Sequence, residues 1–240
     1  MKVRSIYSPN FNKKRRSYKS IKFLIIHYTG MQSERESIIK LCNSKSKVSS
    51  HFVINQKGKI YRLVQDNQIA WHAGKSCWEK YKNLNKTSIG IELVNKGHKF
   101  GYTNFKKKQL SSLIKICKNI IRKYRIKKQN IVGHSDVAPL RKIDPGEKFP
   151  WKELAYEKIG IWHNCNTKIL KKLRKVRISS KFESEFINSL KKIGYCFDNK
   201  KKADFVKIIK AFQRHYRKEL INGIIDRECL LIAKNISKKI

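Results

Sequence analysis

The stretch KFLIIHYTG, from Lys22 to Gly30, gives the clearest indication of the fold. It is a short apolar run rich in isoleucine, and a polar turn that contains Gly30 ends it. A run of this length with such a boundary is typical of a buried β-strand. The predicted strand closes at His27, which is the first candidate for chemistry along the chain.

The segments after this strand alternate between helical and extended patterns. Ser33 followed by Glu36 forms a capping-box signature, which predicts the start of a helix. Gly58 lies in a polar turn between two apolar runs, which indicates a hairpin. The predicted elements are a helix at 33–43, a hairpin at 49–64, a strand at 88–95, an amphipathic helix at 105–126 and a short strand at 130–134. This alternation predicts an α/β fold with a mixed central β-sheet flanked by helices.

Composition divides the chain into four parts. Residues 1–20 form a basic, extended lead-in, and residues 21–163 hold the alternating elements. Residues 164–180 are lysine-rich and are expected to be a linker. Residues 181–240 carry three amphipathic helical patterns, which predict a small three-helix C-terminal domain.

The charge of the chain is extreme. Lys and Arg number 57 against 17 Asp and Glu, a formal net charge of +40, which favours contact with polyanions. However, the lysines are spread along the whole chain together with many Ile and Asn residues, as a coding bias would produce. No basic run is interleaved with stacking aromatic residues, so we expect no nucleic-acid partner.

Cysteines and apolar runs bear on the compartment. The six cysteines are widely spaced without a C-x-x-C pair, which favours reduced thiols, although their even number leaves disulfides open. No leader-like apolar segment and no run of roughly 18 residues that would span a membrane is visible. The absence of a visible signal peptide favours the cytoplasm, with the cell envelope as the alternative. A monomer is expected.

Three potential metal ligands lie at element ends or in a proline-rich loop. His27 closes one predicted strand, His134 closes another, and Asp144 follows ten residues later. Catalytic zinc takes three protein nitrogen or oxygen ligands and keeps one open position. Taken singly, each residue also has an ordinary structural explanation, because strand-end histidines are often hydrogen-bonded and an Asp before Pro145 can serve a turn.

The strings FLIIHYTG, SSHFVINQKGKIYRLV, AWHAG, SIGIELVN and VGHSDVAPLRKIDPGEKFPW occur in this order over residues 20–155. Together they resemble the zinc-dependent N-acetylmuramoyl-L-alanine amidases of the amidase-2 family. The tail, with LKKIGY and AFQRHYR before NGIID, resembles the three-helix peptidoglycan-binding module that follows some of these amidases. The resemblance implies hydrolysis of the amide bond between N-acetylmuramic acid, or its 1,6-anhydro form, and L-alanine.

The resemblance also implies roles for individual residues. One zinc ion would be held by His27, His134 and Asp144. Glu92 would be the catalytic carboxylate, although an acid on a strand can also be merely solvated. Lys142 would stabilise the oxyanion of the tetrahedral intermediate.

Trp71 and His72 match positions that line the substrate cleft of the family, while Trp71 also suits a core position. His51 is expected to be structural or to support the site. His98, His163 and His215 show no partner pattern, so we expect surface or core positions for them.

Two other functions remain open at this stage. The first is a peptidoglycan recognition protein without catalysis, since that family shares the fold, but the full ligand set and Glu92 favour the enzyme. The second is a protein that binds nucleic acid or another polyanion, which only the charge supports.

Overall fold

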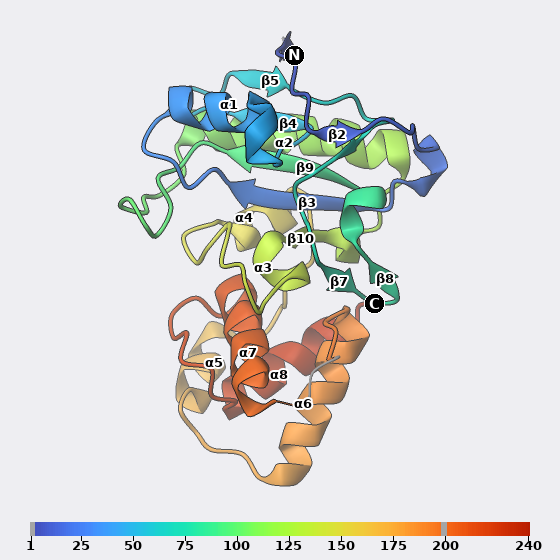
Figure 1. The fold of residues 1–240 in the computed structure, drawn as a ribbon. Helices are drawn as coiled ribbons and strands as arrows, with labels where there is room; N and C mark the ends of the chain where they lie inside the picture. Colours follow the sequence, from blue (N-terminus) through green and yellow to red (C-terminus); the bar gives the residue numbers. More distant parts are fainter. Residues whose placement is uncertain (1–2, 198–200) are drawn as a thin grey trace.

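The computed structural model describes residues 3–197 and 201–240, and its centre is a six-stranded mixed sheet (Figure 1). Strand β3 (Phe23–Tyr28) pairs in parallel with β9 (Ser88–Leu93) on one side and with β10 (Ile131–Gly133) on the other. Beyond β9 follow β4 (Phe52–Ile54), β5 (Ile60–Arg62) and β1 (Val3–Ser5). Among the described strands of this sheet, β4 and β5 form the one antiparallel pair, which is the hairpin that the sequence predicts. The predicted fold class is confirmed.

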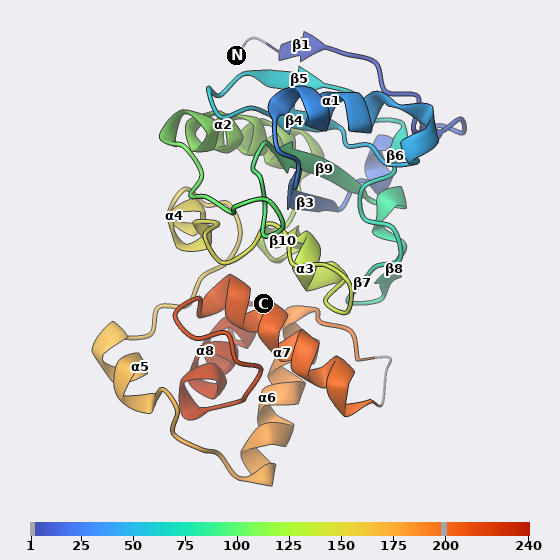
Figure 2. The ribbon, with the colours of Figure 1, turned by 60° about the vertical axis from the view of Figure 1, so that its left-hand side comes forward.

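The helices occupy both sides of this sheet (Figure 2). In chain order they are α1 (Glu34–Cys42), α2 (Lys107–Tyr124), α3 (His134–Val137), α4 (Trp151–Tyr156), α5 (Thr167–Leu173), α6 (Ser180–Ile193), α7 (Lys202–Tyr216) and α8 (Arg227–Ser237). Short 3-10 turns lie at Tyr18–Ser20, Ser44–Ser46, Leu84–Lys86 and Lys128–Asn130. Two small two-stranded sheets join β2 (Phe11–Asn12) with β6 (Ile69–Ala70) and β7 (Cys77–Trp78) with β8 (Tyr81–Lys82).

Strand β3 separates two parts of the core, because successive side chains of a strand point to opposite faces. Leu24 and Ile26 pack in one apolar cluster with Leu113 of α2, while Phe23 and Ile25 belong to another on the opposite face. This alternation leaves His27 on the same face as Phe23 and Ile25. The strand therefore carries its histidine away from α2 and toward α3, where the site forms.

Local signals in the sequence explain the starts and turns of these elements. The Ser33 side chain accepts a hydrogen bond from the Glu36 backbone N–H, which confirms the predicted N-cap of α1. Gly58 takes a φ of +83° in the β4–β5 turn, and a Cβ there would lie 2.6 Å from the Lys108 carbonyl oxygen. That position therefore requires glycine for both conformation and space.

The segments predicted to be a lead-in and a linker both contain secondary structure and buried residues. Residues 3–5 form the edge strand β1 beside β5, and buried Arg16 donates hydrogen bonds to the carbonyls of Asp66, Asn85 and Ser88. The stretch at 164–180 contains α5, whose Leu170 is buried in the C-terminal core. We propose that the catalytic domain begins within the lead-in and that α5 belongs to the C-terminal domain.

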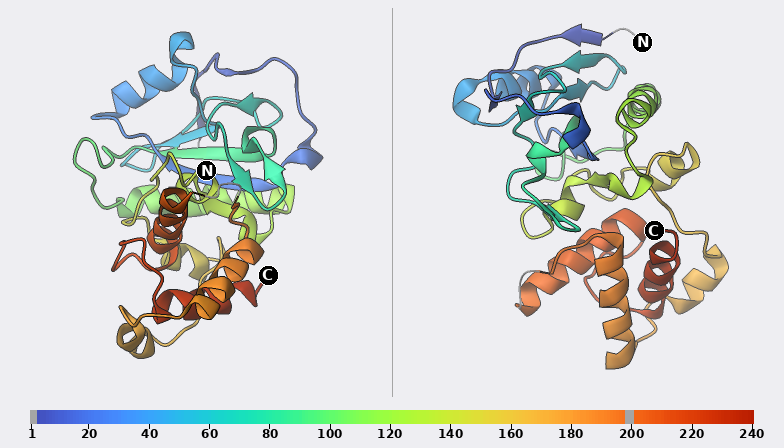
Figure 3. Two further views of the ribbon diagram at one scale, coloured as in Figure 1. Left: turned by 60° about the horizontal axis from the view of Figure 1, so that its bottom comes forward. Right: turned by 90° about the vertical axis from the view of Figure 1, so that its right-hand side faces the viewer.

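The C-terminal helices pack against one side of the sheet domain (Figure 3). Helix α7 contacts both α3 and α4. Inside this part of the chain, buried Arg217 forms ion pairs with Asp226 and Glu228, and Arg174 forms a further pair with Glu228. These pairs compensate the charges that the small helical core buries.

The cysteines are not all reduced, which corrects the expectation drawn from their spacing. Cys77 of β7 and Cys196 after α6 form a disulfide, although 119 residues separate them along the chain. The four other cysteines are free. Spacing in sequence could not reveal this pair, because the two residues meet only where the C-terminal helices contact the β7–β8 hairpin.

No helix in the described part of the chain combines the length and the apolar character that crossing a membrane requires.

Candidate active site

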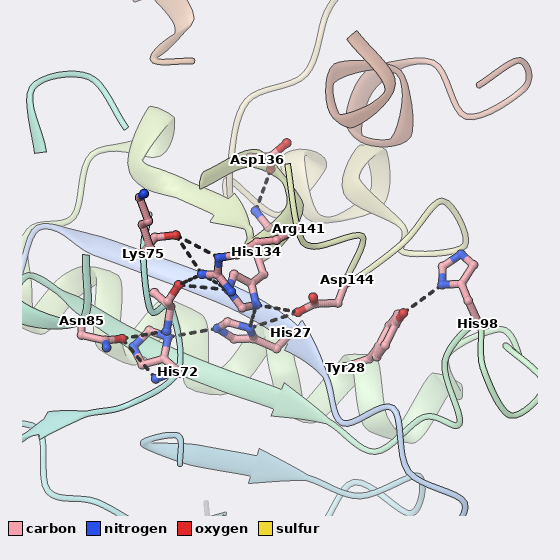
Figure 4. Close-up of polar contacts among 12 residues, drawn as sticks. His27, Tyr28, His72, Lys75, Asn85, His98, His134, Asp136, Arg141 and Asp144 are labelled. Carbon is pink, nitrogen blue, oxygen red and sulfur yellow. Dashed lines mark hydrogen bonds and ion pairs between the residues drawn. The ribbon is translucent and has the colours of Figure 1, made fainter. Parts of the chain in front are cut away.

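Three donor atoms converge at the carboxyl end of β3 (Figure 4). His27 Nδ1 lies 3.0 Å from His134 Nδ1, and Asp144 Oδ2 lies 3.1 Å from each of these nitrogens. All three side chains are buried. The sequence predicts that His134 closes a strand. In the structure, strand β10 ends at Gly133 and His134 begins the short helix α3. The structure thus brings together the three residues that the sequence singled out.

This donor set fits a zinc ion. Three donors bound at 2.0–2.1 Å in a tetrahedral arrangement would be about 3.3 Å apart, close to the separations seen here. Burial, followed by the neighbouring His134, lowers the pKa of His27 to about 4, so its ring is neutral. Burial on its own would raise the pKa of Asp144, but His134 and His27 hold it well below its usual range. A neutral imidazole and an ionised carboxylate are the states that metal binding requires.

A chain of hydrogen bonds behind His27 fixes the orientation of its ring. His27 Nε2 lies 3.0 Å from His72 Nδ1, and His72 Nε2 lies 3.1 Å from the Ser88 hydroxyl. The Ser88 hydroxyl donates to the Leu84 carbonyl. If each ring donates through Nε2, every link in this chain is satisfied and His27 Nδ1 remains free for a metal.

A second arrangement supports His134. Its Nε2 lies 3.2 Å from the Ala73 carbonyl oxygen, which again leaves Nδ1 for the metal. Arg141 donates to the same carbonyl and to the Lys75 carbonyl, so it joins the loop before the disulfide to the loop that carries Asp144. Arg141 lies in the same RKID string as Lys142, but its local sequence gives no sign that it supports His134.

Glu92 lies beside His27 on the neighbouring strand. The two residues are register partners in the parallel pair β3–β9, so their side chains project on the same face. Burial, followed by the charge of Asp144, raises the pKa of Glu92 to about 8, while Lys142 opposes this shift. Its Oε2 is shielded and has no hydrogen-bond partner among the described residues. A carboxyl group in this state can accept and return a proton near neutral pH.

A cleft of about 330 Å³ exposes this centre to solvent. Its walls include Glu92, His134 and Asp144, together with Lys142 and Trp71. Trp71 is partly exposed and its indole N–H donates to Asn12, which holds the ring at the edge of the cleft. The cleft thus places the candidate catalytic groups and the Trp71 ring around the same space.

The model of the Amidase_2 family, described as N-acetylmuramoyl-L-alanine amidase, matches residues 17–147, which include every one of these groups. AmiD of Escherichia coli (strain K12), an N-acetylmuramoyl-L-alanine amidase, is 35% identical over an alignment that covers 93% of this chain and 84% of that protein. The chain belongs to the Amidase_2 family.

Solved structures agree with this membership over nearly the whole chain. The complex of E. coli AmiD with the substrate anhydro-N-acetylmuramic acid-L-Ala-D-γ-Glu-L-Lys has a TM-score of 0.81 at 34% identity, covering 95% of this chain and 93% of that one. AmpDh3 of Pseudomonas aeruginosa in complex with anhydromuramic pentapeptide has a TM-score of 0.80 at 31% identity, covering 95% and 96%. The predicted family and enzyme class are confirmed.

Within this family member, His72 lines the cleft beside Trp71 but shows little of its surface there. Only 8% of it is exposed, and both ring nitrogens already face His27 and Ser88. Burial, followed by the neighbouring His27, lowers the pKa of His72 well below its usual value. A role in substrate binding stays a prediction for His72 and for Trp71. The geometry favours support of His27 by His72 and contact with substrate by Trp71.

Gly90 makes the position of His72 possible. A Cβ at Gly90 would lie 2.5 Å from the His72 ring, closer than real side chains approach. We expect Gly90→Ala to displace His72, to remove the support of His27, and to weaken zinc binding roughly 10- to 100-fold. Competition with a chromogenic chelator measures this affinity.

Gly101→Ala is the control, because no atom lies near its Cβ position. The left-handed φ of Gly101 can lower the stability of this variant but should leave its zinc affinity unchanged. Unchanged affinity in Gly90→Ala would show that His72 does not support the metal site.

Proposed function

We propose that this amidase holds one zinc ion with His27, His134 and Asp144 and cleaves the amide bond between N-acetylmuramic acid and L-alanine. The convergence of these three donors beside Glu92, inside an open cleft, carries the proposal. When bound, zinc supplies the polarisation of a carbonyl oxygen and the activation of water that amide hydrolysis needs.

Glu92 and Lys142 would perform the proton transfer and the charge stabilisation. Glu92 takes a proton from the attacking water and returns it to the leaving amine of L-alanine. Its Oε2 is shielded and has no hydrogen-bond partner among the described residues, so it is free to bind the water or the leaving amine. Lys142 lies on the wall of the same cleft, two residues before Asp144. Its ammonium group stabilises the negative charge that develops on the carbonyl oxygen in the transition state.

The relatives indicate the class of substrate. The E. coli AmiD and P. aeruginosa AmpDh3 complexes both contain an anhydromuramic peptide. We infer that this protein accepts a muropeptide with its lactyl-L-alanine amide directed at Glu92 and the donor cluster. The partly exposed Trp71 ring offers an apolar wall for the sugar or the peptide.

Mass spectrometry of digests tests this function. Purified protein is incubated with intact sacculi and, separately, with 1,6-anhydro-muropeptides, each with and without a zinc chelator. We expect release of peptides that begin with L-alanine. The chelator should stop this release, and added zinc should restore it. Binding of muropeptides without release of peptide, in the presence of one equivalent of zinc, would instead identify a recognition protein. The ratio of rates on the two substrates shows which of them is preferred.

A further inference from the structure

Helix α3 connects the candidate metal site with the C-terminal helices. It begins with His134, and the Ser135 backbone N–H donates to the Asp144 carbonyl at 2.8 Å. The helix therefore carries one of the three donors and fixes the backbone of another. A shift of α3 would move both of them relative to His27 on the sheet.

Asp136 of α3 is the residue that the C-terminal part of the chain holds. Its side chain is 1% exposed, and Oδ2 accepts the Gly133 backbone N–H at 2.7 Å, which caps the helix. The Tyr195 hydroxyl donates to Oδ1 at 2.7 Å, and His215 Nδ1 lies 2.7 Å from Oδ2. Two of the three donors on this buried carboxylate thus come from beyond residue 190. A buried carboxylate needs such partners, because its desolvation is costly without them.

Both partners are themselves fixed in place. The His215 ring stacks on Trp151 of α4, with ring centroids 3.9 Å apart and an interplanar angle of 13°. The Tyr195 ring packs against Trp78, and the neighbouring Cys196 forms the disulfide with Cys77. Burial and the nearby Asp136 raise the pKa of Tyr195 well above its usual value, so the hydroxyl stays protonated and donates a hydrogen bond to Asp136.

The junction at the start of α3 leaves little room for movement. A Cβ at Gly133 would lie 2.7 Å from Pro145 and 3.2 Å from both Asp136 and Trp151. The loop that carries Asp144, the N-terminus of α3 and α4 therefore meet in one tightly packed contact. Catalytic groups require positions accurate to about 0.5 Å, and such accuracy comes from the residues that support them.

We propose that Tyr195 and His215 are positioning residues of the amidase site: through Asp136 they hold α3 so that His134 and Asp144 face His27. The C-terminal helices then help to complete the catalytic centre and do not form a separate module. This inference rests on the proposed zinc site. Its test reads metal geometry directly, so it can fail while the proposed amidase reaction stands.

The first set of variants removes the two donors in the full-length protein. Tyr195→Phe deletes one hydroxyl, and His215→Leu deletes the ring donor. His215→Asn is the conservative partner, because its amide N–H can take the place of Nδ1–H. The matched control is Gln213→Met on the same helix, which removes buried hydrogen bonds to Gly223 and Ile224 without touching Asp136.

Four measurements separate positioning from stability: the melting temperature, affinity for zinc by chelator competition, the visible spectrum of the Co²⁺-substituted protein, and kcat and KM on a muropeptide. Tyr195→Phe and His215→Leu should each weaken zinc binding roughly 10-fold. They should also alter the cobalt spectrum and lower kcat more than KM changes, and His215→Asn should restore much of the loss. Gln213→Met should lower the melting temperature and leave the other readouts unchanged.

The opposite pattern would overturn the proposal. If Tyr195→Phe and His215→Leu lower the melting temperature but keep the cobalt spectrum, zinc affinity and kcat of the unmodified protein, the contacts are structural only. Equal effects of Gln213→Met on all readouts would have the same meaning. Should His215→Leu fail to fold, Tyr195→Phe decides the outcome, because it removes one oxygen atom and keeps the ring that packs on Trp78.

Discussion

Replacement of His134 by alanine is expected to abolish zinc binding and amide hydrolysis together. The substitution removes one of three donors that lie within 3.1 Å of each other, and two donors no longer hold a catalytic zinc ion. We expect turnover to fall by at least about 10³-fold, which corresponds to roughly 4 kcal/mol of transition-state stabilisation. Metal content of the purified variant, measured together with peptide release from muropeptides, checks this result.

The control for this prediction is His163→Ala. His163 stacks on Trp162 and is not part of the donor cluster. The His163→Ala variant should keep one equivalent of zinc and near-normal turnover. Activity that survives in His134→Ala would mean that His134 is not a metal ligand. Loss of activity with normal zinc content would assign it a role in proton transfer or substrate binding instead.

Glu92→Gln is expected to separate metal binding from chemistry. The amide keeps the size of the carboxyl group but cannot take a proton from water, so zinc stays bound while kcat falls by about 10²- to 10⁴-fold. KM should change little, because the change affects the transition state more than substrate binding. Zinc content, kcat and KM of the same preparation provide the comparison.

An exposed carboxylate supplies the matched control for Glu92. Glu153→Gln makes the same chemical change on α4, in a side chain that is exposed and lies outside the cleft, and it should leave kcat unchanged. Turnover retained in Glu92→Gln would remove this residue from the catalytic role. Loss of zinc in that variant would indicate that Glu92 acts on the metal site rather than on the water.

Local sequence patterns predict much of the secondary structure of the catalytic domain. The isoleucine-rich strand, the capped helix after Ser33 and the turn at Gly58 each have a short-range physical cause, and each appears in the structure, although the strand continues one residue beyond His27 to Tyr28. The ordered motifs then identified the family. Their agreement with the structure follows because buried strands, caps and tight turns depend on neighbouring residues.

Local sequence patterns predict only part of the candidate site. His27, His134 and Asp144 were named from position and resemblance, and the structure brings their donor atoms together. The support behind them is not visible in the sequence, because the Ala73 carbonyl reaches His134, and Arg141 reaches that carbonyl, from more than 60 positions away along the chain. Nothing in the local sequence of these residues marks them as neighbours.

The chain's local sequence established an α/β amidase domain, its ligand candidates and the helical character of its C-terminal part. The fold alone established that Cys77 pairs with Cys196 and that Tyr195 and His215 reach Asp136. These contacts join residues 59 to 119 positions apart, so no periodicity or short motif encodes them. They form because the apolar faces of the C-terminal helices are buried against α3 and the β7–β8 hairpin, and that burial brings distant polar groups within hydrogen-bonding distance.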